Sequence, residues 1–316
     1  SLIGLRNLND LRTVPKRKKD GKKKATKQAD LPFEELPDVL GDAAEKTRSI
    51  TAIDEDDTDQ QKEVFEEAHE TADAMIAPLA DLYTAYLMDY DIDQDNYRFL
   101  FRHFAKGNSA DDLPAGRLAE IWEVVEAYQD YHKFFHWPVR FPEVFGPDGG
   151  GGFSATVGNP PWDIVKPNSQ EFFSNYDPKF RSYKKQQANK VAKKLMERNP
   201  AIEEAWQVYS DAFEEQSTFF RQPSTYPALG KGDINTFKLF MGQFFYVLRP
   251  DGRMGIVAPS GIYTDQGCQP LRQLFLSKSR IDFLYCFENK RGIFNIHRMF
   301  KFVIFGTTKG GKTKAF

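Results

Sequence analysis

Residues 153–162 read Phe-Ser-Ala-Thr-Val-Gly-Asn-Pro-Pro-Trp. The first five have the composition of a short strand, which Gly158 and the two prolines end. Strand and helix patterns alternate after it, with a helix over 235–248, a strand over 254–258, a helix over 268–277 and strands over 281–287 and 300–305. This alternation predicts an α/β fold whose sheet is mostly parallel, with helices on its faces. Ligands of such sheets lie beyond the carboxyl ends of the strands, which is where Asn159 to Trp162 falls.

The segment Asn159-Pro160-Pro161-Trp162 resembles the Asn-Pro-Pro-aromatic motif of amino-methyltransferases that act on DNA. The resemblance extends to four further stretches, Phe135–Phe145, Gly232–Phe237, Gly252–Ile262 and Phe287–Phe294. These are similar to the adenine-N6 methylases of restriction–modification and phage-defence systems. The resemblance covers most of residues 134–305 and residues 1–4. It implies a Rossmann-like methyltransferase sheet with helical insertions, S-adenosyl-L-methionine as cofactor and double-stranded DNA as substrate.

The chemistry implied by the resemblance explains the residue types in the motif. The lone pair of the adenine N6 amine is delocalised into the ring, which makes the nitrogen a poor nucleophile. Asn159 Oδ1 and the Pro160 carbonyl would accept its two N–H bonds beside the methyl donor, while Pro160 and Pro161 stiffen the loop. Trp162 would stack on the extruded base. The alternative is a proline-rich turn with Trp162 in the core, and we favour the catalytic loop.

The second set of candidate site residues lies before the last predicted strand. In the resembled family an aromatic residue there packs on the flipped adenine, opposite the motif aromatic, and Phe294 holds the matching position. Phe294 as a plug of the sheet is an almost equal alternative. Lys290, Arg291 and Arg298 are predicted to contact DNA phosphates, whereas His297 is expected to be an ordinary surface residue.

The sequence departs from the resembled family in its cofactor motif. No acid-x-x-x-Gly-x-Gly loop precedes Asn159, and Gly149–Gly152 stands before a strand rather than after one. We therefore expect an incomplete sheet whose first strands are missing. The cofactor-binding half is expected upstream of Ser1 in the same polypeptide, and a target-recognition domain downstream of Phe316.

The remaining sequence suggests three regions. Residues 1–60 are expected to be a basic and then acidic linker, residues 61–133 a helical insertion, and residues 134–316 the catalytic-loop half, with a second helical insertion at 166–230. The basic run from Lys16 to Lys27 is read as a solvated loop in preference to a phosphate-binding arm. A second basic helix fits either interpretation equally and contains Lys184, Lys185, Lys190, Lys193 and Lys194.

Composition limits the other function classes. The net charge of −2 means that contacts with nucleic acid must come from local patches. Cys268 and Cys286 lack metal-ligand spacing and are expected to be reduced core residues of a cytoplasmic protein, so no metal site is predicted. No apolar run has the length of a membrane span.

The predicted function is therefore site-specific methylation of adenine N6 in DNA, with base flipping, in restriction–modification or antiviral defence. Two alternatives stay open, a non-catalytic DNA-binding or scaffold subunit of a defence complex and a protein glutamine methyltransferase. Other subunits of a defence system are open as further partners.

Overall fold

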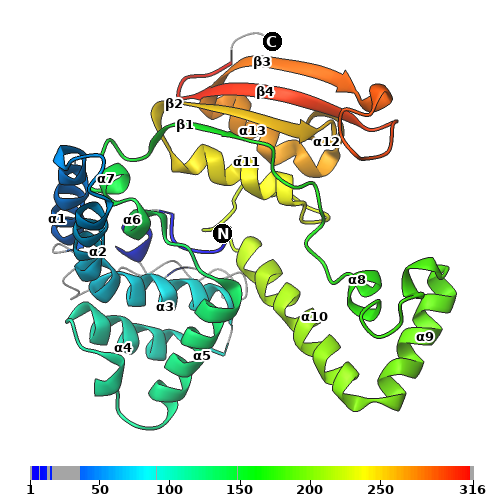
Figure 1. Ribbon diagram of the computed structural model, residues 1–316, viewed down its shortest axis with the longest axis horizontal. Coiled ribbons are helices and arrows are strands. Elements are labelled where there is room, and N and C mark those ends of the chain that lie inside the picture. The colour runs from blue at the N-terminus through cyan, green and yellow to red at the C-terminus, as the bar shows by residue number, and fades with distance from the viewer. Residues whose placement is uncertain are drawn as a thin grey trace.

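The computed structural model describes residues 2–6, 8–12, 15, 36–89, 91–147 and 149–313. The basic run Lys16–Lys27 lies outside these residues. The predicted α/β class is confirmed, because a four-stranded sheet carries helices on one face and is joined to a helical body and a helical arm (Figure 1). None of the described helices is long and apolar enough to span a membrane.

The sheet has the strand order β1 (Phe153–Gly158), β2 (Leu248–Pro259), β4 (Lys301–Lys309) and β3 (Ser279–Glu288). Only β1 and β2 are parallel, and β4 runs antiparallel to both β2 and β3. The prediction of a mostly parallel sheet is therefore wrong. The segment between β3 and β4 contains only the short η7 (Asn289–Arg291), whereas a parallel connection needs a crossover, usually a helix.

One face of the sheet is packed and the opposite face is exposed. Helices α11 (Thr236–Val247), α12 (Gly261–Thr264) and α13 (Gln269–Lys278) cover the packed face with a core that includes Met241, Phe275 and Phe305 (Figure 1). Apolar side chains of β1, β3 and β4 stand exposed on the other face, namely Val157, Phe283, Tyr285, Phe287 and Ile304.

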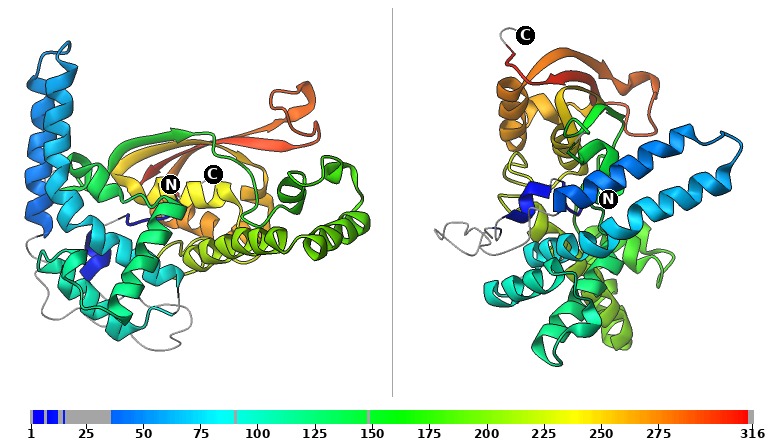
Figure 2. Two further views of the ribbon diagram at one scale, coloured as in Figure 1. Left: turned by 60° about the horizontal axis from the view of Figure 1, so that its bottom comes forward. Right: turned by 90° about the vertical axis from the view of Figure 1, so that its left-hand side faces the viewer.

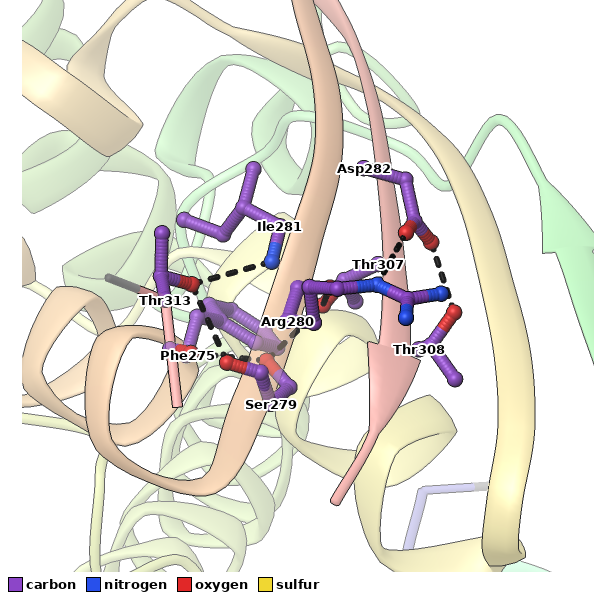
Figure 3. A network of polar contacts seen from close by, with 8 residues as sticks. All are labelled: Phe275, Ser279, Arg280, Ile281, Asp282, Thr307, Thr308 and Thr313. Atoms are coloured by element: carbon purple, nitrogen blue, oxygen red, sulfur yellow. Dashed lines mark hydrogen bonds and ion pairs between the residues drawn. The ribbon is translucent and has the colours of Figure 1, made fainter. Parts of the chain in front are cut away.

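Polar side chains fix the register between β3 and β4 where β3 begins and β4 ends (Figure 3). Thr307 Oγ1 lies 2.8 Å from Ser279 Oγ and donates to the Arg280 carbonyl. Asp282 accepts from Thr308 Oγ1 at 2.7 Å and from Arg280 Nε at 2.9 Å. A one-residue slip would break these bonds and reverse every side chain of β3.

The helical body contains α1 (Leu36–Ser49), α2 (Thr58–Met75), α3 (Ala77–Met88), α4 (Gln94–Ala105) and α5 (Arg117–His132). Its core includes the fully buried Leu79, Tyr86, Tyr97 and Phe101. Helices α1 and α2 form a hairpin that projects from the body (Figure 2). A linker was expected through residue 60, but Leu40, Ala43 and Ala44 of α1 are buried and make this part of the body.

Two short segments pair where the body joins the sheet, one at the start of the chain and one at residues 135–137. The carbonyls of Ile3 and Leu5 accept hydrogen bonds from the backbone N–H groups of Phe135 and Trp137. The chain then continues through α6 (Trp137–Arg140) and α7 (Pro142–Phe145) into β1.

Between β1 and α11 the chain leaves the sheet and forms the arm, residues 169–220. The arm comprises α8 (Ser169–Phe173), α9 (Lys185–Arg198) and α10 (Pro200–Phe220) (Figures 1 and 2). A small core of its own holds the arm together and includes Phe173, Phe180 and Ile202.

Candidate active site

The Asn159–Trp162 loop lies at the carboxyl end of β1, where the parallel strand β2 also ends. Gly158 packs closely against α11 at this turn, since a Cβ there would lie 3.1 Å from the Phe244 ring. Thr236, at the start of α11, then holds the loop in place by hydrogen bonds. Thr236 Oγ1 donates to the carbonyls of Pro161 at 2.6 Å and Asp163 at 3.1 Å, and Thr236 N also donates to Asp163.

The loop leaves two acceptors available. Thr236 occupies the Pro161 carbonyl, but among the described residues nothing donates to the Asn159 side chain or to the Pro160 carbonyl. Asn159 is exposed and Pro160 is buried. Neither proline has an N–H that could compete for these acceptors. The loop thus presents a side-chain oxygen and a backbone oxygen from adjacent residues to a ligand that brings two donors.

The two predicted base-stacking residues are brought together. The ring centroids of Trp162 and Phe294 lie 5.7 Å apart with 66° between the ring planes. Both rings are half-buried, and Phe294 also packs edge-on against Phe302 of β4 at 4.9 Å. An aromatic base cannot be sandwiched between two rings in edge-to-face contact. Base entry therefore requires Phe294 to move away from Trp162.

Asn289 organises the segment that carries Phe294, and the sequence reasoning did not assign it this role. Its side chain is fully buried, accepts from Phe294 N at 2.9 Å, and donates to the carbonyls of Phe294 at 3.0 Å and Ile296 at 3.2 Å. Thr236 was likewise missed as the residue that holds the loop. The only signal for Thr236 was its place at a helix start, and the signal for Asn289 was a short amide residue just before Gly292.

The three cations predicted to bind phosphate differ in whether a carboxylate of the described residues already pairs with them. Lys290 Nζ lies 2.6 Å from Glu288 Oε2, and this hydrogen-bonded ion pair raises the pKa of Lys290 and lowers that of Glu288. Arg291 and Arg298 are exposed and form no ion pair within the described residues. The His297 ring accepts from Met299 N at 3.3 Å on the surface, as expected of an ordinary histidine.

A wide groove of about 1000 Å³ begins at Trp162 and runs between the catalytic loop and the arm. Its walls come from residues 162–171, from the first turns of α9 and from one face of α10. Tyr209 and Phe213 of α10 lie half-buried in this lining.

Asn159 and Pro160 were also predicted to border the methyl donor, and their acceptors are free among the described residues. The glycine-rich run before β1 has a different place. Gly149–Gly152 forms a turn ahead of β1, and a Cβ at Gly152 would lie 2.5 Å from the Val247 carbonyl. Gly152 therefore lies against the start of β2, and Gly149 lies against Glu143 and Val144 of α7.

Of the two cysteines, Cys268 is buried as expected and Cys286 is exposed. The expectation of two core cysteines is thus wrong for Cys286, which pairs with the buried Val303 of β4 but lies on β3, the outermost strand of the sheet.

Comparison with curated proteins gives no match for this chain. A family model does match, over residues 87–200, and it describes the Eco57I restriction-modification methylase. The matched range includes β1, the Asn159–Trp162 loop and the arm through α9. The family segment thus contains the loop that geometry marks as the site, and residues 87–200 of the chain are similar to this methylase family.

Proposed function

We propose that this protein methylates adenine N6 at specific sites in double-stranded DNA, with S-adenosylmethionine as methyl donor. The setting is a cytoplasmic restriction–modification or phage-defence system. The observation that carries the proposal is the pair of unoccupied acceptors, Asn159 Oδ1 and the Pro160 carbonyl, on a loop that Thr236 fixes at the carboxyl end of β1.

These two acceptors increase the nucleophilicity of an exocyclic amine, whose lone pair is otherwise delocalised into the ring. When both accept N–H bonds from N6, the nitrogen lone pair is drawn out of conjugation and directed toward the incoming methyl group. S-adenosylmethionine, when bound, supplies that methyl group on an electrophilic sulfonium. The loop is stiff before substrate arrives, so the stabilisation needs little reorganisation during the reaction. No side chain with a shifted pKa is needed as a base.

Base flipping delivers the amine to the loop. Trp162 offers one face of its indole, and Phe294 leaves its edge contact to cover the other face of the adenine. Arg291 and Arg298, exposed beside Phe294, contact the neighbouring phosphates.

The decisive experiment is to incubate the natural full-length protein with unmethylated DNA and S-adenosylmethionine that carries a labelled methyl group. The DNA is then hydrolysed to nucleosides, which are separated and identified by mass spectrometry. The proposal expects labelled N6-methyldeoxyadenosine. Label in N4-methyldeoxycytidine contradicts the choice of base, and label in the glutamine of an added protein supports the glutamine alternative. DNA binding without any transfer supports a scaffold subunit.

A further inference from the structure

One part of the arm, residues 179–198, carries a local excess of positive charge. Residues 179–198 contain one carboxylate, Glu197, and a series of exposed cations, Lys179, Arg181, Lys184, Lys185, Lys190, Lys193, Lys194 and Arg198. Lys193 pairs with Glu197 at 3.7 Å, and the other seven form no ion pair within the described part of the chain. The positive charge belongs to residues 179–198 alone, because the eight cations of the arm are matched by eight carboxylates, five of them on α10.

The cations fall on different sides of α9. Lys185, Ala188 and Asn189 line the groove that begins at Trp162, while Ala188 and Ala192 also pack in the core of the arm. Lys194 stands nine residues after Lys185, which at 3.6 residues per turn places it on the opposite side of the helix. The groove therefore receives one lysine from α9, and the outer lysines face solvent.

Lys166 supplies a second cation to the lining of the groove. It follows the catalytic loop directly, is exposed, and has no ion-pair partner among the described residues. Backbone bonds fix its position, because Val165 N donates to the Ile234 carbonyl at 2.8 Å and Ile164 bridges to Asn235. Lys166, Lys185 and Trp162 thus all line the same groove, from the segment after the loop, from α9 and from the loop itself.

The rest of the lining suits a nucleotide strand. Amide and hydroxyl groups dominate, from Asn168, Ser169, Gln170, Asn189 and Gln216, and the rings of Tyr209 and Phe213 offer flat apolar surface for sugars or bases. Asp163 and Glu171 also line the groove, and their two negative charges balance the positive charges of Lys166 and Lys185. The groove therefore has no net formal charge, and each lysine would bind a separate phosphate group. The volume of about 1000 Å³ exceeds the needs of a single base.

We infer that this groove holds the DNA strand flanking the flipped adenine, with Lys166 and Lys185 on its phosphates. The inference rests on the proposed function and extends it, because it assigns the arm a place in substrate binding. An extruded base on Trp162 leaves its own strand beside the loop, and the groove is the space that opens there. The outer lysines contribute only a solvated face.

The test compares two matched double variants of the full-length protein, Lys166→Ala with Lys185→Ala in the groove and Lys190→Ala with Lys194→Ala on the outer side. Each removes two exposed positive charges, and thermal unfolding checks that both variants fold. Binding to a short fluorescein-labelled DNA duplex of mixed sequence is followed by anisotropy between about 50 and 200 mM salt.

The groove variant is expected to lose about tenfold in affinity at low salt. The slope of log K against log salt should become shallower by about 2, one unit for each phosphate contact. The outer variant should stay within twofold of the unmodified protein and keep its slope. Lysine-to-arginine replacements at 166 and 185 should restore binding, since the charge is kept.

Equal losses in both variants, or a larger loss in the outer one, would overturn the inference while DNA methylation stands. An unchanged groove variant would do the same and would leave the groove to another occupant, such as a protein segment. If the unmodified protein binds no DNA at all, the proposed function fails and the inference falls with it.

Discussion

At the scale of single residues, the account depends on what the Asn159–Trp162 loop leaves unpaired. The Pro161 carbonyl is occupied by Thr236, whereas Asn159 Oδ1 and the Pro160 carbonyl are open within the described residues. A structural proline turn would have no reason to hold one carbonyl and leave the adjacent one open at a strand end. The buried Nε1 of Trp162 also lacks a hydrogen-bond partner in this part of the chain, which is a cost that a purely structural tryptophan would avoid.

Replacement of the indole tests the stacking role. Trp162→Ala should weaken binding to an abasic target less than it slows methylation of normal duplex, because each base–aromatic stack is worth about 1–3 kcal/mol and forms only once the base is out. The measurement is the fluorescence of 2-aminopurine placed at the target position, which rises on flipping. An equal rise in the alanine variant and the unmodified protein would show that Trp162 does not hold the base.

At the scale of elements, the start of α11 positions the catalytic loop. Thr236 contributes its backbone N–H and its hydroxyl, and the bridge between Ile164 and Asn235 continues the contact. These bonds join two segments that are far apart in the sequence and hold the loop in place. Such positioning affects the rate of reaction more than the affinity for substrate.

Thr236→Val removes the hydroxyl and keeps the side-chain shape. We expect a destabilisation of about 1 kcal/mol, the usual net worth of a hydrogen bond, together with a clear fall in kcat at nearly unchanged DNA affinity. Thr236→Ser, which keeps the hydroxyl, is the matched control and should retain most of the kcat. A valine variant with the kcat of the unmodified protein would mean that the loop holds its shape without α11.

The helices and strands also show how much of the fold could be predicted from the sequence. The predicted strands and helices after residue 153 are all found near their expected places, because their apolar periods are regular. The direction of β4 was missed, since strand patterns do not encode orientation, and so was α1, whose acidic flanks suggested a linker. The contact between Trp162, at the end of the Asn159–Trp162 loop, and Phe294 was anticipated from the resemblance alone. Thr236 and Asn289 act through backbone contacts that no local pattern reveals.

At the scale of the whole molecule, the sheet has an open side. β1 pairs only with β2 in the described structure, so its other edge carries free backbone groups, and the face with Val157 and Tyr285 is apolar and exposed. Exposed edges and contiguous apolar faces indicate surfaces that another polypeptide segment covers. The methyl donor of the proposed function would take its glycine turn and its acid from such a covering segment.

The isolated 316-residue chain should therefore bind S-adenosylmethionine weakly. The described residues contribute the Asn159 loop, but no glycine loop after a strand and no acid for the ribose. Isothermal titration calorimetry of this chain with S-adenosylmethionine should give no saturation at about micromolar ligand. A micromolar dissociation constant would mean that the cofactor pocket is complete within these residues.

The central claim is that Asn159 acts on the amine during methyl transfer. Its most direct test is Asn159→Ala in the natural full-length protein, measured by single-turnover methylation of DNA and by DNA affinity side by side. An acceptor that works mainly in the transition state should affect the rate and spare the binding. The account predicts that transfer is abolished while the dissociation constant for DNA changes no more than a few-fold. A variant that keeps most of the turnover rate would contradict it.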